Sequence, residues 1–193
     1  MAERPLLTPD LDEESVDQTE YRSMIRSLTY LIASRPDIMF SVCQCARHLA
    51  NPKLPHLILV KSIFRYLKGS AKLGLWYPKN PDFDLYAFAG SNYGGCDLDR
   101  KSTSGGCQFL GDRLVSWKCK KQQMISTSMA KAEYVAASAC CSQVIWIQHQ
   151  LLDYDLNSLD TSIFCNNDAA IQIDKNPVQH SKINQIDIKV HFL

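Results

Sequence analysis

The spacing of apolar residues changes near residue 80 from a helical period to a strand period. Upstream, apolar side chains recur every three or four residues, as in amphipathic helices. They predict helices over about 21–34, 36–47 and 55–67. Pro36 suits the first turn of the second helix, and Lys68-Gly69 is a typical helix end. We therefore expect a three-helix unit over 18–78.

Downstream of residue 82, apolar and polar residues alternate, which is typical of half-buried strands. Three antiparallel strands are predicted over 84–90, 107–111 and 113–122, the last two joined by a hairpin at Gly111-Asp112. The polar residues 91–106 are expected to form a loop. One long helix over 126–153, a buried strand over 161–167 and a helix from residue 168 complete the prediction. The expected fold class is α/β, with three antiparallel strands, a long helix, a fourth strand and a helix.

Charge is unevenly distributed along the chain. The 193 residues contain 21 Lys+Arg and 20 Asp+Glu, but the first 20 residues hold seven of the acids and one of the bases. Residues 1–17, with Pro5 and Pro9 and no periodicity, are predicted to be an acidic flexible leader. Between Arg100 and Lys131, seven bases face one acid, Asp112. This stretch predicts a polyanionic partner or, alternatively, a solvated basic face without a ligand.

Several classes of protein are disfavoured. Apolar runs fall short of the ~20 residues of a membrane span, and the N-terminus has no basic flank with an apolar stretch after it. We therefore expect a cytoplasmic or nuclear protein that is neither secreted nor bound to a membrane. The eight cysteines include no C-x-x-C pair, so small buried thiols are expected rather than zinc ligands. Trp117 and Trp146 lie in apolar patterns and are predicted to be core residues.

Several ordered blocks carry a family resemblance. They include YRSMIRSLTYLIASRPDIMF, DRKSTSGGCQFLG, LVSWKCKKQ, AEYVAASA and KNPVQHSKINQIDIKVHF. These blocks closely resemble the end of the Pol polyprotein of copia-type LTR retrotransposons of plants. The resemblance implies that residues 18–78 are the helical tail of a reverse transcriptase, whose upstream part is absent. It also implies that residues 82–193 are a C-terminally truncated ribonuclease H-like domain.

The family resemblance implies a hydrolase that cleaves the RNA strand of an RNA/DNA hybrid. Its two Mg²⁺ (or Mn²⁺) ions are held by four carboxylates, which offset the repulsion between the cations. The family motif F-A-D-S-D-Y-G-G reads here with Gly90 at the first Asp and Asn92 at the second. The helix Glu is retained as Glu133, and the C-D-N motif has Asn166 in place of its Asp. The fourth carboxylate is expected beyond the last residue, and Asp187 is a further candidate metal ligand.

Three functional hypotheses follow from this pattern. The first is a catalytically inactive ribonuclease H-like domain, because the positions of two carboxylates hold Gly90 and Asn166. The second is a non-catalytic nucleic-acid-binding module that uses basic residues, namely Arg100, Lys101, Lys118, Lys120 and Lys121. The third is residual nuclease activity through Asn166, Glu133 and Asp187. Glu133 is predicted to be a metal ligand or, alternatively, a surface helix residue. Lys131 stands where the family has a second Glu.

Overall fold

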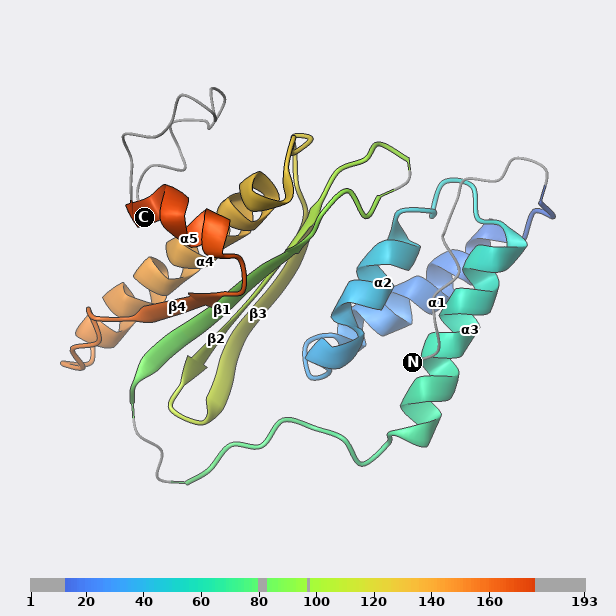
Figure 1. The fold of residues 1–193 in the computed structure, drawn as a ribbon. Coiled ribbons are helices and arrows are strands. Elements are labelled where there is room, and N and C mark those ends of the chain that lie inside the picture. The colour runs from blue at the N-terminus through green and yellow to red at the C-terminus, as the bar shows by residue number, and fades with distance from the viewer. Residues whose placement is uncertain (1–12, 80–82, 97, 176–193) are drawn as a thin grey trace. The chain divides into compact units, whose positions relative to one another are not determined.

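The computed structural model describes residues 13–79, 83–96 and 98–175. The chain divides into two compact units, Met1–Leu75 and Trp76–Leu193. Figure 1 shows helices in the first unit and a sheet with two helices in the second. Each unit has its own hydrophobic core.

The first unit, called the helical unit below, consists of α1 (Gln18–Leu31), a 3-10 turn η1 (Pro36–Ile38), α2 (Met39–Ala46) and α3 (Leu54–Gly69). Asp17 caps α1, because its carboxylate accepts hydrogen bonds from the backbone N–H groups of Thr19 and Glu20. The second predicted helix is divided into η1 and α2. Pro36 has no N–H to donate, and it occupies the first position of the 3-10 turn.

The apolar stripes of the three helices face one another. The fully buried core includes large side chains from each of them, namely Tyr21, Ile25, Leu28, Ile38, Val42, Val60 and Ile63. The Tyr21 hydroxyl donates a hydrogen bond to the Cys45 carbonyl at 2.8 Å. Burial, with a smaller contribution from the nearby Cys45 thiol, raises the pKa of Tyr21 far above its usual value.

The end of the predicted leader is paired with the helical unit. The Leu54 N–H donates to the Glu14 carbonyl at 3.0 Å, and the Val16 N–H donates to the Pro52 carbonyl at 3.3 Å. Ser15 and Lys53 form an antiparallel bridge. The prediction of a flexible leader otherwise falls on residues 1–12, which lie outside the described residues.

The second unit, called the sheet unit below, has the predicted element order. Its strands are β1 (Leu85–Asn92), β2 (Thr103–Leu110), β3 (Arg113–Lys121) and β4 (Ser162–Cys165), in the spatial order β3-β2-β1-β4. The first three are antiparallel neighbours, and β4 runs parallel to β1. Helix α4 (Met129–Leu152) packs on β1 and β2, and α5 (Asp168–Lys175) packs on α4 (Figure 1). The predicted α/β class is therefore confirmed.

The first hairpin is longer than predicted. The loop expected over 91–106 is shorter, because β1 continues to Asn92 and β2 begins at Thr103, its partner in register. The β-branched Thr103 favours extended backbone, and Gly105 and Gly106 pair with Gly90 and Ala89 across the ladder. Polar composition indicated a loop, but hydrogen bonding to β1 keeps these residues in a strand.

One prediction about the core of the sheet unit is wrong. Trp146 on α4 is 58% exposed, whereas Val144 and Ile147 on either side face the sheet. A helix that packs along one sheet face buries one stripe of side chains, and Trp146 lies off that stripe. Trp117 on β3 is partly buried. Within the described residues, no helix has the length and apolar character needed to cross a membrane.

Candidate functional site

Glu133 lies where α4 meets the ends of two parallel strands. Its side chain is 6% exposed, so the alternative of a surface helix residue is wrong. Oε1 accepts a hydrogen bond from the backbone N–H of Ser91 on β1 at 3.1 Å. The thiol of Cys165, the last residue of β4, lies 3.9 Å from Oε2. The carboxylate therefore connects α4 to β1 and β4.

Gly90 and Asn166 lie at the same end of the sheet as Glu133. In the parallel register, Ala89 pairs with Cys165, so Gly90 and Asn166 each follow a residue of that pair. A Cβ atom added at Gly90 would meet no atom within 4 Å. The structure thus brings together three positions that are 33 or more residues apart in the sequence. Asp187, the further candidate ligand, lies outside the described residues.

The donors at this end of the sheet do not fit a pair of divalent cations. Mg²⁺ prefers anionic oxygen ligands, and two adjacent cations need several of them. Gly90 has no side-chain donor, Asn166 is neutral, and Glu133 already accepts the Ser91 N–H. Among the described residues, no group of three His, Cys, Asp or Glu side chains could hold a metal ion. This end of the sheet therefore offers a single carboxylate among the described residues, which is too few for two adjacent magnesium ions.

Ser91 and Cys165 are contacts of Glu133 that the sequence alone did not indicate. Each directly adjoins a position singled out by motif, because Ser91 follows Gly90 and Cys165 precedes Asn166. Both contacts depend on α4 crossing the strand ends. Parallel strands end at the same edge of a sheet, and this rule could have predicted that Ser91 and Cys165 lie close together there.

The basic residues form two groups rather than one surface. Lys121 and Lys101 both contact Asp99, at 2.8 and 3.7 Å between nitrogen and oxygen. The hydrogen bond from Lys121 lowers the pKa of Asp99 to about 2, and Asp99 in turn raises the pKa of Lys121. Asp99 immediately precedes the stretch in which only Asp112 was counted as an acid. Arg100, beside it, has a left-handed backbone conformation with φ of 54°.

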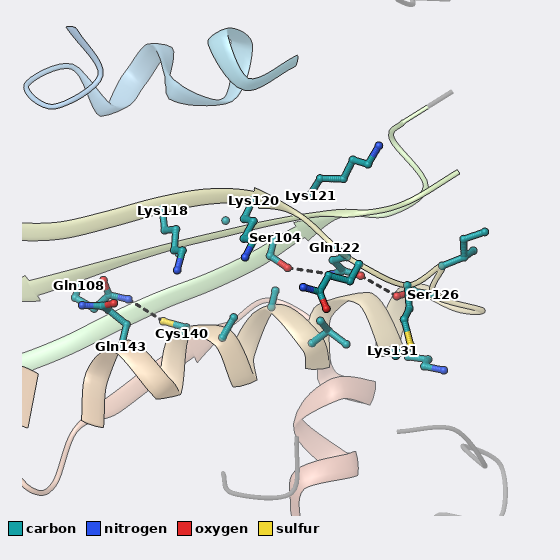
Figure 2. A pocket seen from close by; sticks show the side chains of 18 residues that line it. Ser104, Gln108, Lys118, Lys120, Lys121, Gln122, Ser126, Lys131, Cys140 and Gln143 are labelled. Atoms are coloured by element: carbon teal, nitrogen blue, oxygen red, sulfur yellow. Dashed lines mark hydrogen bonds between the residues drawn. The ribbon is translucent and has the colours of Figure 1, made fainter. Parts of the chain in front are cut away.

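Lys118 and Lys120 form the second group, on β3. They are exposed and, within the described part of the chain, form no ion pair. Figure 2 shows both side chains directed toward α4, whereas Lys121 is directed away from it. Lys118 and Lys120 line a cavity of about 340 Å³ between β2, β3 and α4, which we call the β3–α4 pocket.

Comparisons with known proteins identify a relationship along the whole chain. The chain is 33% identical to the retrovirus-related Pol polyprotein from transposon RE1 of Arabidopsis thaliana, over 100% of its length and 13% of that relative. It is 29% identical to the polyprotein from transposon TNT 1-94 of Nicotiana tabacum, over 94% of the chain and 14% of the relative. An uncharacterized mitochondrial protein of Arabidopsis thaliana is 35% identical over 67% of the chain and 54% of the relative. No protein-family profile and no solved structure matches the chain.

These matches show that the chain is homologous to a region of retrovirus-related Pol polyproteins of transposons. More particularly, it is a homologue of the copia-type Pol polyproteins of plant transposons, as the sequence blocks predicted. The chain spans about 13% of the length of its RE1 and RE2 relatives, so their complete activities do not follow from the match.

Proposed function

We propose that residues 82–193 are a ribonuclease H-like domain of a retrotransposon Pol polyprotein that does not cleave RNA/DNA hybrids. The homology to Pol polyproteins and the order β3-β2-β1-β4 support the domain assignment. The observation that carries the loss of activity is the position of Glu133. It lies at the strand ends beside Gly90 and Asn166, where the family resemblance implies two further carboxylates.

Electrostatics explains why this difference abolishes catalysis. Two divalent cations about 4 Å apart repel each other strongly in a site that excludes water. Carboxylates offset that repulsion and also hold the ions in position on the attacking and leaving oxygens. Replacement of two of them by Gly90 and Asn166 removes two negative charges. Glu133 alone does not provide enough negative charge for the pair.

A cleavage assay tests the loss of activity directly. The full chain is incubated with a labelled RNA/DNA hybrid in Mg²⁺ and, separately, in Mn²⁺, and compared with Glu133→Gln. We expect the two proteins to give the same background signal, because within residues 13–79, 83–96 and 98–175 Glu133 has no partner carboxylates with which to hold two ions. Cleavage by the unmodified chain above the Glu133→Gln background would overturn the proposal.

Restoration of the two carboxylates tests the assignment of the site. Gly90→Asp is sterically permitted, since the space around an added Cβ is open. The double variant Gly90→Asp/Asn166→Asp should bind Mg²⁺ at least about tenfold more tightly than the unmodified chain, measured by calorimetry. Gly90→Asn is the matched control, because asparagine has the same size without the charge. An equal affinity in the double variant and the control would contradict the assignment.

We also propose that the domain retains affinity for RNA/DNA hybrid through its basic side chains. Lys118, Lys120 and Arg100 support this proposal, because the described part of the chain gives them no acidic ion-pair partner. Phosphate contacts make such binding independent of sequence and sensitive to salt. Lys118→Ala/Lys120→Ala should weaken hybrid binding and reduce its salt dependence. Lys61→Ala/Lys68→Ala, with the same loss of charge in the helical unit, should not. Equal affinities of the two double variants would contradict this second proposal.

A further inference from the structure

The β3–α4 pocket arises from small residues on facing elements. Gly106 on β2 faces Cys140 on α4, since a Cβ added at Gly106 would lie 3.6 Å from Cys140 Sγ. Gly106, Ala136 and Ala139 line the pocket, and their small size leaves its interior open. Because α4 packs on β1 and β2, the edge strand β3 extends beside the helix rather than beneath it. The resulting volume of about 340 Å³ lies at the small end of the range for small-molecule sites.

The charge that lines this pocket is entirely positive. Its lining residues include four lysines and neither aspartate nor glutamate, and of these lysines Lys121 is paired with Asp99 and directed away from α4. Lys118 and Lys120 are two residues apart on a strand, so their side chains leave the same face of the sheet, and both are directed toward α4 (Figure 2). Neighbouring ammonium groups repel each other, and a dianion between them removes that repulsion. A phosphate monoester fits this pair better than a single carboxylate does.

The interior of the pocket combines apolar walls with amides. Val135 and Ala136 provide apolar surface, while Gln108, Gln122 and Gln143 provide amide groups. Gln122 is held in place, because its Nε2 donates to Ser104 Oγ at 3.0 Å and to the Ala132 carbonyl at 2.9 Å. Gln122 Oε1 also accepts from Ser126 Oγ at 2.9 Å, so its amide is fully used within the protein, and Gln108 and Gln143 are the amides left for a ligand. Such a lining suits a flat apolar ring with polar edges, and glutamine amides are groups that proteins use to bind adenine edges.

Gln108 adds a requirement for a hydrogen-bond donor on the ligand. Its Nε2 donates to Cys140 Sγ at 3.2 Å, as the dashed line in Figure 2 shows. Its Oε1 is buried and accepts no hydrogen bond from any described residue. A buried acceptor without a partner is unfavourable, so a ligand with an N–H group at its inner edge would stabilise this position.

We infer that the β3–α4 pocket binds a nucleoside monophosphate, either free or as one nucleotide of a single strand. The phosphate lies between Lys118 and Lys120, and the base lies between β2 and α4 with an amino group toward Gln108. This inference goes beyond the proposed function. It requires neither a metal ion nor a hybrid duplex, so it stands or falls separately from the loss of cleavage.

Calorimetric titration of the full chain with adenosine monophosphate tests the inference. We expect saturable binding of one molecule per chain, at least about tenfold tighter than that of inorganic phosphate. Lys118→Ala/Lys120→Ala should weaken binding at least about tenfold, and Lys61→Ala/Lys68→Ala should leave it unchanged. If adenosine monophosphate binds no more tightly than inorganic phosphate, or if the first double variant has no effect, the inference is wrong.

A second variant tests the pocket without removing charge. Ala139 is exposed on α4 and lines the pocket, so Ala139→Phe fills the space for the base while the helix is kept. Ser142→Phe, one turn later on the same helix, lies outside the pocket and is the matched control. Ala139→Phe should abolish adenosine monophosphate binding, and Ser142→Phe should not. If the two variants bind adenosine monophosphate equally well, the nucleotide does not bind in the β3–α4 pocket.

Competition distinguishes the two sources of the nucleotide. A short oligoadenylate that displaces adenosine monophosphate, and whose own binding is lost in Ala139→Phe, supports a nucleotide of a single strand. Failure of the oligoadenylate to compete supports a free nucleotide. Hybrid binding should persist in Ala139→Phe, because that variant leaves every lysine in place. The nucleotide pocket and the hybrid-binding proposal can therefore be tested separately.

Discussion

The helical unit and the sheet unit differ in how completely they bury their apolar surface. In the helical unit, Tyr21, Ile38 and Ile63 are wholly inaccessible at the centre of one core. In the sheet unit, α4 covers one face of the sheet, and the other face carries a cluster of aromatic rings. Two members of that cluster, Phe88 and Phe164, are 44% and 51% exposed.

Because of this difference, we expect the helical unit to contribute mainly stability and the sheet unit to contribute the binding sites. A closed core leaves little surface for a ligand, whereas an incompletely covered sheet leaves edges, pockets and strand ends accessible. The Glu133 cluster and the β3–α4 pocket both belong to the sheet unit. We expect substitutions in the helical unit to change stability and substitutions in the sheet unit to change binding first.

The largest expected effect is the truncation of a core isoleucine. Ile63→Ala creates a cavity in a fully buried site and should lower the free energy of unfolding of the helical unit by about 4 kcal/mol. Ile147→Ala, at a site that is 8% exposed in the smaller core, should cost about 2 kcal/mol. Urea denaturation of the full chain measures both.

The positions of the tryptophans allow the two units to be followed separately. Trp76, Trp117 and Trp146 all lie in the sheet unit, so tryptophan fluorescence reports that unit alone, whereas far-ultraviolet circular dichroism reports helices of both. Ile63→Ala should shift the circular dichroism transition and leave the fluorescence transition unchanged. If both transitions shift equally, the two units unfold together, and the expectation that they are separately stable is wrong.

The pH dependence of the helical unit is the next largest effect. Burial, with smaller contributions from His56 and Arg47, lowers the pKa of His48 to about 4. In the unfolded chain the pKa is about 6.5, so below that pH the unfolded state binds a proton that the folded state does not. The free energy of unfolding of the helical unit should therefore keep its full value above pH 6.5 and fall by about 1–3 kcal/mol as the pH approaches 4.

Matched variants isolate this titration from that of the carboxylates. His48→Phe keeps a ring against His56, whose centroid lies 3.8 Å from that of His48, and should remove the pH dependence between 6.5 and 4. His149→Gln, an exposed histidine of the sheet unit, should retain it. A slope that persists in His48→Phe would show that another group is responsible.

Local patterns predicted the elements of both units, but pairing across the sheet was needed to place side chains. Sequence patterns located the strands and helices of the described residues apart from the division of the second helix into η1 and α2, yet they assigned Thr103–Gly106 to a loop because composition does not reveal a strand partner. A motif resemblance singled out Gly90, Glu133 and Asn166, but their proximity depends on the parallel register of β1 and β4. The charge count treated Lys101 and Lys121 as available, because Asp99 lies immediately outside the counted stretch.

A smaller effect is expected from loss of the Glu133 carboxylate. Glu133→Ala leaves the Ser91 N–H without its acceptor and should destabilise the sheet unit by about 1–2 kcal/mol. Glu133→Gln keeps an oxygen at the same place and should retain most of the stability. Fluorescence-detected urea denaturation measures both variants. Equal stabilities of the two variants would mean that the hydrogen bond to Ser91 does not contribute.

The smallest expected effect concerns Lys131, the third residue of α4. Ser128 caps this helix, and its hydroxyl accepts the Lys131 N–H at 3.2 Å. A cation in the first turn opposes the helix dipole, whereas a glutamate there would interact favourably with the dipole and accept a hydrogen bond from the Ser128 N–H. Lys131→Glu should therefore stabilise the sheet unit by about 0.5–1 kcal/mol, measured by fluorescence-detected urea denaturation.

Lys131→Gln separates the two causes of that gain, because glutamine can accept the same backbone hydrogen bond without a negative charge. It should recover about half of the stabilisation. A loss of stability in Lys131→Glu would show that the buried ammonium is favourable where it stands. In that case the positive charge around the β3–α4 pocket would contribute to the stability of the sheet unit as well as to binding, and the separation between the two units would be weaker than their cores indicate.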